Sequence, residues 1–71
     1  MDFINQLKVL LQHKDLEVVE WSLRCICDLG PQSLFLKENV LTLHFPKHRF
    51  FSKSFRMCHE LRDHLKRQWS L

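Results

Sequence analysis

The chain has 71 residues, a formal net charge of +3 and a hydrophobic fraction of 45%. A chain of this length forms one domain at most, residues 1–71, and leaves little room for a preorganised pocket, so we expect no enzyme. The hydrophobic fraction argues against disorder. No apolar run approaches the ~20 residues of a membrane span, and an acid at Asp2 without a basic n-region predicts no signal peptide.

The first residues predict an amphipathic helix. Asp2 is a suitable N-cap, and the helical pattern extends to about His13. The apolar residues that share one face at helical spacing are Phe3, Ile4, Leu7, Leu10 and Leu11. This face predicts that the helix packs against the rest of the domain.

A second helix is predicted from a cap at Asp15 to an end at Leu29. It should stop there because Gly30 suits the left-handed position after a helix and Pro31 cannot continue one. Its apolar arc is wide enough to be covered on two sides. One side is expected to pack inside the chain. The other is our candidate dimer or partner interface, which comprises Val18, Trp21, Cys25 and Leu29, joined by Trp69 from the end of the chain.

The stretch "LKVLLQHKDLEVVEWSLRCICDLG" resembles one armadillo or HEAT unit, in which two helices meet at a short break and end in glycine. Such units bury their faces against stacked neighbours. The chain holds no second copy, so we interpret the resemblance as a helical hairpin rather than as a solenoid.

In residues 34–45 the spacing of apolar residues changes from the helical pattern to the alternation typical of a strand. Leucines alternate with other residues on both sides of Lys37-Glu38-Asn39, which is a fair turn. We therefore predict a β-hairpin with strands near 34–37 and 40–45. The alternative is a third short helix from Pro31, a residue favoured at the first helical position, which would make the chain an all-α bundle.

From Ser52 the pattern is helical again. The apolar stripe comprises Phe51, Phe55, Cys58, Leu61, Leu65 and Trp69. On the same helix, Arg56 with Glu60 and Asp63 with Arg67 are four residues apart and can form ion pairs. The predicted fold is therefore α+β and dominated by helix: a helical hairpin, a short β-hairpin and a C-terminal amphipathic helix.

The charge is divided along the chain. Residues 1–46 have a net charge of −2, with four cations against six acids, whereas residues 47–71 have +5, with seven against two. No acid occurs between residues 39 and 59. Such asymmetry favours a polyanionic partner. The predicted nucleic-acid-binding residues are Lys47, Arg49, Phe50, Lys53, Arg56, Lys66 and Arg67.

The histidines and cysteines predict neither a metal site nor a cofactor. Cys25 and Cys27 are two residues apart on a helix, so their side chains point ~160° apart and cannot bind one ion together. The odd number of cysteines, three, fits reduced thiols in the cytoplasm or nucleus.

These observations favour a small accessory protein that binds nucleic acid as a homodimer. RNA is favoured over DNA, because paired basic helices can recognise the shape of a duplex through its phosphates. Alanine is absent from a helical sequence, which suggests a reading frame under another constraint, as in a compact viral genome. The alternative is a protein-interaction module that docks a host or cellular partner through aromatic helix faces.

Overall fold

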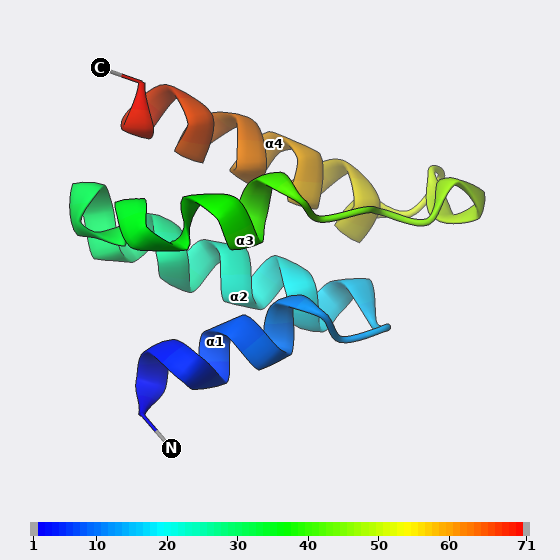
Figure 1. Ribbon diagram of the computed structural model, residues 1–71. Helices are drawn as coiled ribbons and strands as arrows, with labels where there is room; N and C mark the ends of the chain where they lie inside the picture. Colours follow the sequence, from blue (N-terminus) through cyan, green and yellow to red (C-terminus); the bar gives the residue numbers. More distant parts are fainter. Residues whose placement is uncertain (1, 71) are drawn as a thin grey trace.

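The computed structural model describes residues 2–70, and all of its regular structure is helical (Figure 1). Four α-helices and two 3₁₀ segments follow one another in chain order. They are α1 (Phe3–Leu11), α2 (Leu16–Leu29), η1 (Gly30–Leu36), α3 (Lys37–Leu41), η2 (Lys47–Arg49) and α4 (Lys53–Trp69). The all-α alternative therefore fits, and the α+β prediction was wrong.

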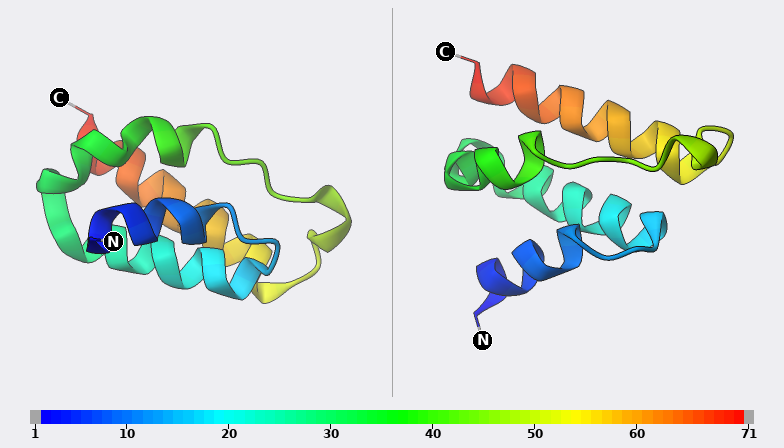
Figure 2. Two further views of the ribbon diagram at one scale, coloured as in Figure 1. Left: turned by 60° about the horizontal axis from the view of Figure 1, so that its bottom comes forward. Right: turned by 45° about the vertical axis from the view of Figure 1, so that its right-hand side comes forward.

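The helices form a thin layered body of about 32 × 30 × 18 Å. Helix α2 lies in the middle and packs most extensively against α4, with α1 on its other side (Figure 1). Segments η1 and α3 cross from α2 toward α4, and residues 43–46 continue without regular structure to η2 at one end of the molecule (Figure 2). No helix within residues 2–70 is long and apolar enough to cross a membrane.

The predicted caps of the first two helices are confirmed. The carboxylate of Asp2 accepts a hydrogen bond from the backbone N–H of Asn5 at 2.8 Å, and that of Asp15 accepts one from Glu17 at 2.9 Å. Gly30 follows α2 with φ +71°, in the region that disfavours side chains with a Cβ. The Asp15 cap thus sets the start of α2, and the positive φ of Gly30 marks its end.

The predicted β-hairpin is absent from the described residues. The segment continues from α2 as η1, with proline in its first turn, and then as α3. Its inward residues are Ser33, Leu36 and Val40, which are all buried and recur every three to four residues. Leu34 is exposed, so the apparent alternation of leucines does not mark a buried sheet face.

The C-terminal helix begins at the predicted place, because the hydroxyl of Ser52 caps it and accepts a hydrogen bond from the N–H of Phe55 at 3.0 Å. Its inward stripe includes Cys58, Leu65 and Trp69. The prediction that Phe51 belongs to this stripe was wrong, because Phe51 precedes the Ser52 cap and is 73% exposed.

One buried polar link joins the two ends of the core. The indole N–H of Trp69 donates to the hydroxyl of Ser33 at 3.0 Å, and that hydroxyl donates to the carbonyl of Gly30 at 2.7 Å. Both donors are satisfied, and the end of α4 is thereby fixed to the start of η1.

Candidate nucleic-acid interface

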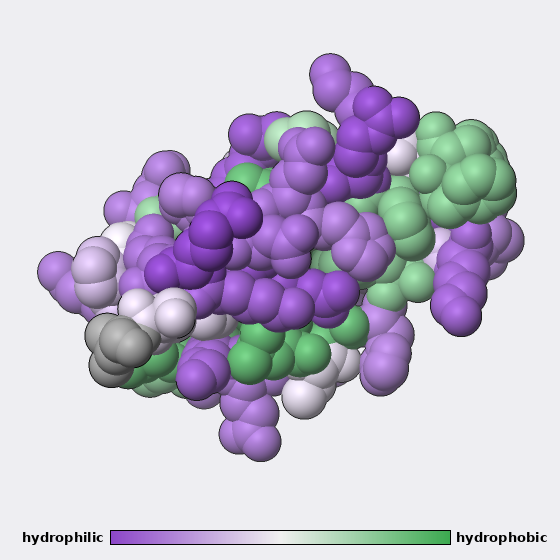
Figure 3. Space-filling view, turned by 90° about the horizontal axis from the view of Figure 1, so that it is seen from above, coloured by the Kyte–Doolittle hydropathy of each residue, from purple (hydrophilic) through white to green (hydrophobic). Residues whose placement is uncertain are grey.

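The η2 turn and the start of α4 form a basic tip with exposed aromatic rings. Phe50 is 72% exposed, and its ring meets that of Phe51 edge to face, with centroids 6.1 Å apart. Figure 3 shows a hydrophobic patch at this end of the molecule beside a hydrophilic surface. The exposed cations around the two rings are Lys47, Arg49, Lys53 and Arg56. We call this surface the basic tip.

Lys66 and Arg67 are also exposed, but they lie far from the basic tip. They follow Lys53 by thirteen residues or more on one straight helix, which places them roughly 20 Å away at 1.5 Å per residue. The seven predicted residues therefore divide into a compact group of five and a separate pair.

The predicted ion pairs of α4 do not form. Among residues 2–70, the one pair within 4 Å joins Glu20 and Arg24 on α2, at 2.7 Å. Arg56 therefore has no carboxylate partner among the described residues. A cation without such a partner can contact a phosphate without first breaking an ion pair.

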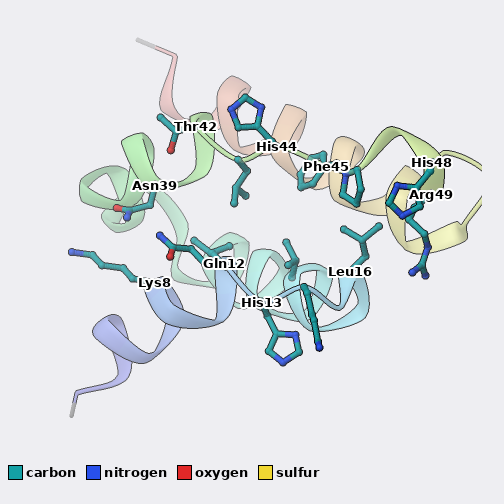
Figure 4. Close-up of a pocket in the computed structure, with 15 residues that line it drawn as sticks. Lys8, Gln12, His13, Leu16, Asn39, Thr42, His44, Phe45, His48 and Arg49 are labelled. Atoms are coloured by element: carbon teal, nitrogen blue, oxygen red, sulfur yellow. The ribbon is translucent and has the colours of Figure 1, made fainter.

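A groove lies between the α1–α2 connection and the chain from α3 to η2 (Figure 4). Its volume is about 560 Å³, and none of its lining residues is acidic. Figure 4 shows Gln12 and Asn39 at one end, on opposite walls, and His48 and Arg49 at the other. The basic lining residues are Lys8, His13 and Lys14 on the wall from the first two helices, and His44, His48 and Arg49 on the other.

The floor of this groove is apolar. Leu11, Leu16 and Val19 are almost fully buried residues of the core, and Leu43 and Phe45 line the opposite wall. On the α1–α2 connection, the backbone N–H of Asp15 donates to Nδ1 of His13 at 3.0 Å, which fixes that imidazole. The groove thus combines an apolar floor with cationic edges.

Arg62 fastens the second wall to α4. Its guanidinium donates to the carbonyl of Leu43 at 2.8 Å and lies 4.6 Å above the ring of Phe45. The imidazole of His59 packs against both Phe45 and Phe55, at 4.8 and 4.6 Å between centroids, and these two rings also meet each other at 6.2 Å. We call these four residues, Phe45, Phe55, His59 and Arg62, the wall clamp. Their contacts fix the segment between α3 and η2 to α4, although this segment does not pair with a strand.

The environment of the wall clamp changes the pKa of His59. Burial and the neighbouring positive charge of Arg62 lower this pKa from its ordinary value, although Asp63 opposes them. The neutral imidazole is therefore favoured in the folded protein, which suits a ring that meets Phe45 edge to face and Phe55 at a tilt.

No three His, Cys, Asp or Glu side chains within residues 2–70 form a group that could hold a metal ion. The three cysteines are free thiols. Cys58 is fully buried, and its thiol donates to the carbonyl of Leu16 at 3.7 Å. Burial raises the pKa of this thiol to about 11, so it is poorly suited to act as a nucleophile.

The predicted interface residues separate in the structure. Trp21 is 52% exposed in the middle of α2, and Val18, Cys25 and Leu29 are half-buried. Trp69 is only 4% exposed, because its indole completes the core. The candidate docking surface on α2 is therefore centred on Trp21 alone.

The groove was missed in the sequence because its two walls are some thirty residues apart. Lys8, His13 and Lys14 belong to the half of the chain with net negative charge, so composition gave no sign of their role. The exposure of Phe51 could have been predicted from the sequence, since Ser52 as an N-cap excludes the preceding residue from the helix.

The chain matches no protein-family model, and no curated protein or solved structure matches it.

Proposed function

We propose that this protein binds nucleic acid, with RNA preferred over DNA, through the basic tip. The observation that carries the proposal is the acid-free group of exposed cations, Lys47, Arg49, Lys53 and Arg56, around two exposed phenylalanine rings. Cations neutralise phosphates and release counterions, and aromatic faces stack on bases. The protein is not an enzyme in this proposal, because its role is to bind and sequester.

Salt dependence supplies the first test. Four phosphate contacts at a slope of about −0.7 each predict that affinity for a single strand falls roughly 50-fold between 50 and 200 mM salt. Fluorescence anisotropy with labelled RNA and DNA, each single-stranded and duplex, measures this slope. Absence of binding to all four probes at 50 mM salt would refute the proposal.

Charge reversal supplies the second test. Lys53→Glu with Arg56→Glu should weaken binding at least tenfold and flatten the salt dependence. The matched control is Lys37→Glu with Lys66→Glu, which makes the same change in net charge and lies at the other end of the molecule, where both residues line a shallow pocket. Because Lys66 was itself a predicted contact, the control also shows whether binding extends along α4.

A second candidate function is docking of a protein partner, including a second copy of the chain, through Trp21. An exposed tryptophan in the middle of a central helix is a typical interface anchor. Trp21→Ala should halve the mass of an assembly measured by light scattering and leave RNA affinity per chain nearly unchanged. Phe35→Ala is the matched control, because Phe35 is similarly exposed, at 56%, on η1. A wild-type mass of about 8.7 kDa at all concentrations would exclude the homodimer.

A further inference from the structure

The groove beside the basic tip has the composition of a nucleotide site. Its volume, about 560 Å³, lies within the ~300–1,000 Å³ range of small-ligand sites. A nucleotide has at one end a flat base, with apolar faces and a polar edge, and at the other end a phosphate. The groove offers the matching arrangement, because its floor is apolar and its edges carry cations without any acidic lining residue.

The polar groups at the two ends of the groove differ in kind. At one end the side-chain amides of Gln12 and Asn39 lie on opposite walls, and Lys8 is beside them (Figure 4). Amides offer both donors and acceptors, as the edge of a base requires. At the other end His48 supplies a hydrogen-bonding imidazole and Arg49 supplies donors and positive charge suited to a phosphate (Figure 4).

We propose that the groove receives one nucleotide of a single-stranded nucleic acid, with its base on the apolar floor and its phosphate at the end that holds His48 and Arg49. This inference rests on the proposed function and adds that the bound nucleic acid is single-stranded. A base inside a duplex is stacked on both faces, so only an unpaired base can turn into a groove. The neighbouring nucleotide then lies beside Phe50 and Phe51, where its base can stack.

The test blocks the groove without changing charge. Gln12 and Thr42 are exposed lining residues on opposite walls, and neither is charged. Gln12→Trp and Thr42→Trp should each lower the affinity for a labelled single-stranded RNA hexamer at least tenfold, and should leave affinity for duplex RNA within twofold. Phe35→Trp is the control for an added indole outside the groove.

Competition identifies the ligand chemistry in the wild-type protein. Adenosine or uridine 5′-monophosphate should displace the hexamer at least tenfold more effectively than ribose 5-phosphate or inorganic phosphate. Equal competition by ribose 5-phosphate would show that the base is not bound and would overturn the inference. Stronger competition by dodecyl phosphate would overturn it in favour of an alkyl phosphate, such as the end of a lipid.

Amide chemical shifts in the wild-type protein keep the inference testable if a blocking variant fails to fold. Titration with the mononucleotide should produce its largest shift changes in residues 12–14 and 39–45. Unchanged hexamer affinity in both blocking variants, together with loss in Lys53→Glu with Arg56→Glu, would overturn this inference and leave the proposed function standing. Absence of any nucleic-acid binding would overturn both.

Discussion

Removal of the Arg62 guanidinium tests the wall clamp directly. Arg62→Met keeps an unbranched apolar side chain of similar length, so most packing by the stem is retained. It removes the hydrogen bond to the carbonyl of Leu43 and the contact with the ring of Phe45. We expect a stable but weakened fold in which the second wall of the groove is loosened.

The magnitude follows from three contributions. A hydrogen bond from a charged donor is worth about 1.5–3 kcal/mol, and a cation over a partly exposed ring about 0.5–1 kcal/mol. Against these, Nε of Arg62 is buried without a hydrogen-bond partner among the described residues, and its removal returns about 1–3 kcal/mol. The net loss is about 1 kcal/mol, which corresponds to a decrease in Tm of about 4–8 °C for a domain of this size.

Urea denaturation at 25 °C measures the free energy of unfolding of Arg62→Met. The matched control is Arg56→Met, the same substitution at an exposed position of α4, which should change stability by less than about 0.5 kcal/mol. A double-mutant cycle with Phe45→Leu should give a coupling energy of about 0.5–1 kcal/mol. Zero coupling, with Arg62→Met as stable as Arg56→Met, would refute the wall clamp as an energetic unit.

Two further outcomes are expected from buried contacts. Because the pKa of His59 is lowered in the folded protein, the unfolded chain takes up the proton first as pH falls below the ordinary value of 6.5. The free energy of unfolding should therefore decrease from pH 7.5 to pH 5, and it should decrease less in His59→Gln. Urea denaturation across this pH range measures both; parallel profiles for the wild type and the variant would contradict the expectation. Trp69→Phe removes the donor to Ser33 and should cost about 1–3 kcal/mol from the lost hydrogen bond and lost ring volume, whereas an unchanged Tm would contradict the role of that link.

Helix boundaries were predictable where one residue determines them. The side chains of Asp2, Asp15 and Ser52 cap backbone N–H groups two or three residues ahead, and Gly30 adopts a positive φ directly after α2. These contacts depend only on neighbouring sequence. The predicted caps at Asp2 and Asp15 and the predicted end at Leu29 therefore agree with the structure, whereas the first helix ends at Leu11 rather than near His13.

The region after Gly30 was misread because two periodicities compete in it. Leu34 and Leu36 alternate as in a strand, but Ser33, Leu36 and Val40 follow helical spacing. The helical set is the buried one, and Ser33 was not recognised as a core residue because it is polar. Its hydroxyl is buried with two hydrogen-bond partners, Gly30 and Trp69, and the second is 36 residues away.

The basic tip was partly predictable and the groove was not. A run without acids from residue 39 to 59 is visible in the sequence, and the cations and Phe50 within it are exposed. The groove depends on the packing of α1 and α2 against a segment some thirty residues later. No local pattern encodes such a contact.

The peripheral position of α1 has a consequence for exchange of backbone amides. This helix packs mainly on one side of α2 and makes a smaller contact with α3, whereas α2 lies between two neighbours. Opening of α1 exposes less apolar surface than global unfolding, so its amides should exchange through a partial opening of lower free energy. The same motion separates the groove walls, since the α1–α2 connection forms one of them. A ligand that bridges both walls therefore protects α1 from hydrogen exchange without touching most of its residues.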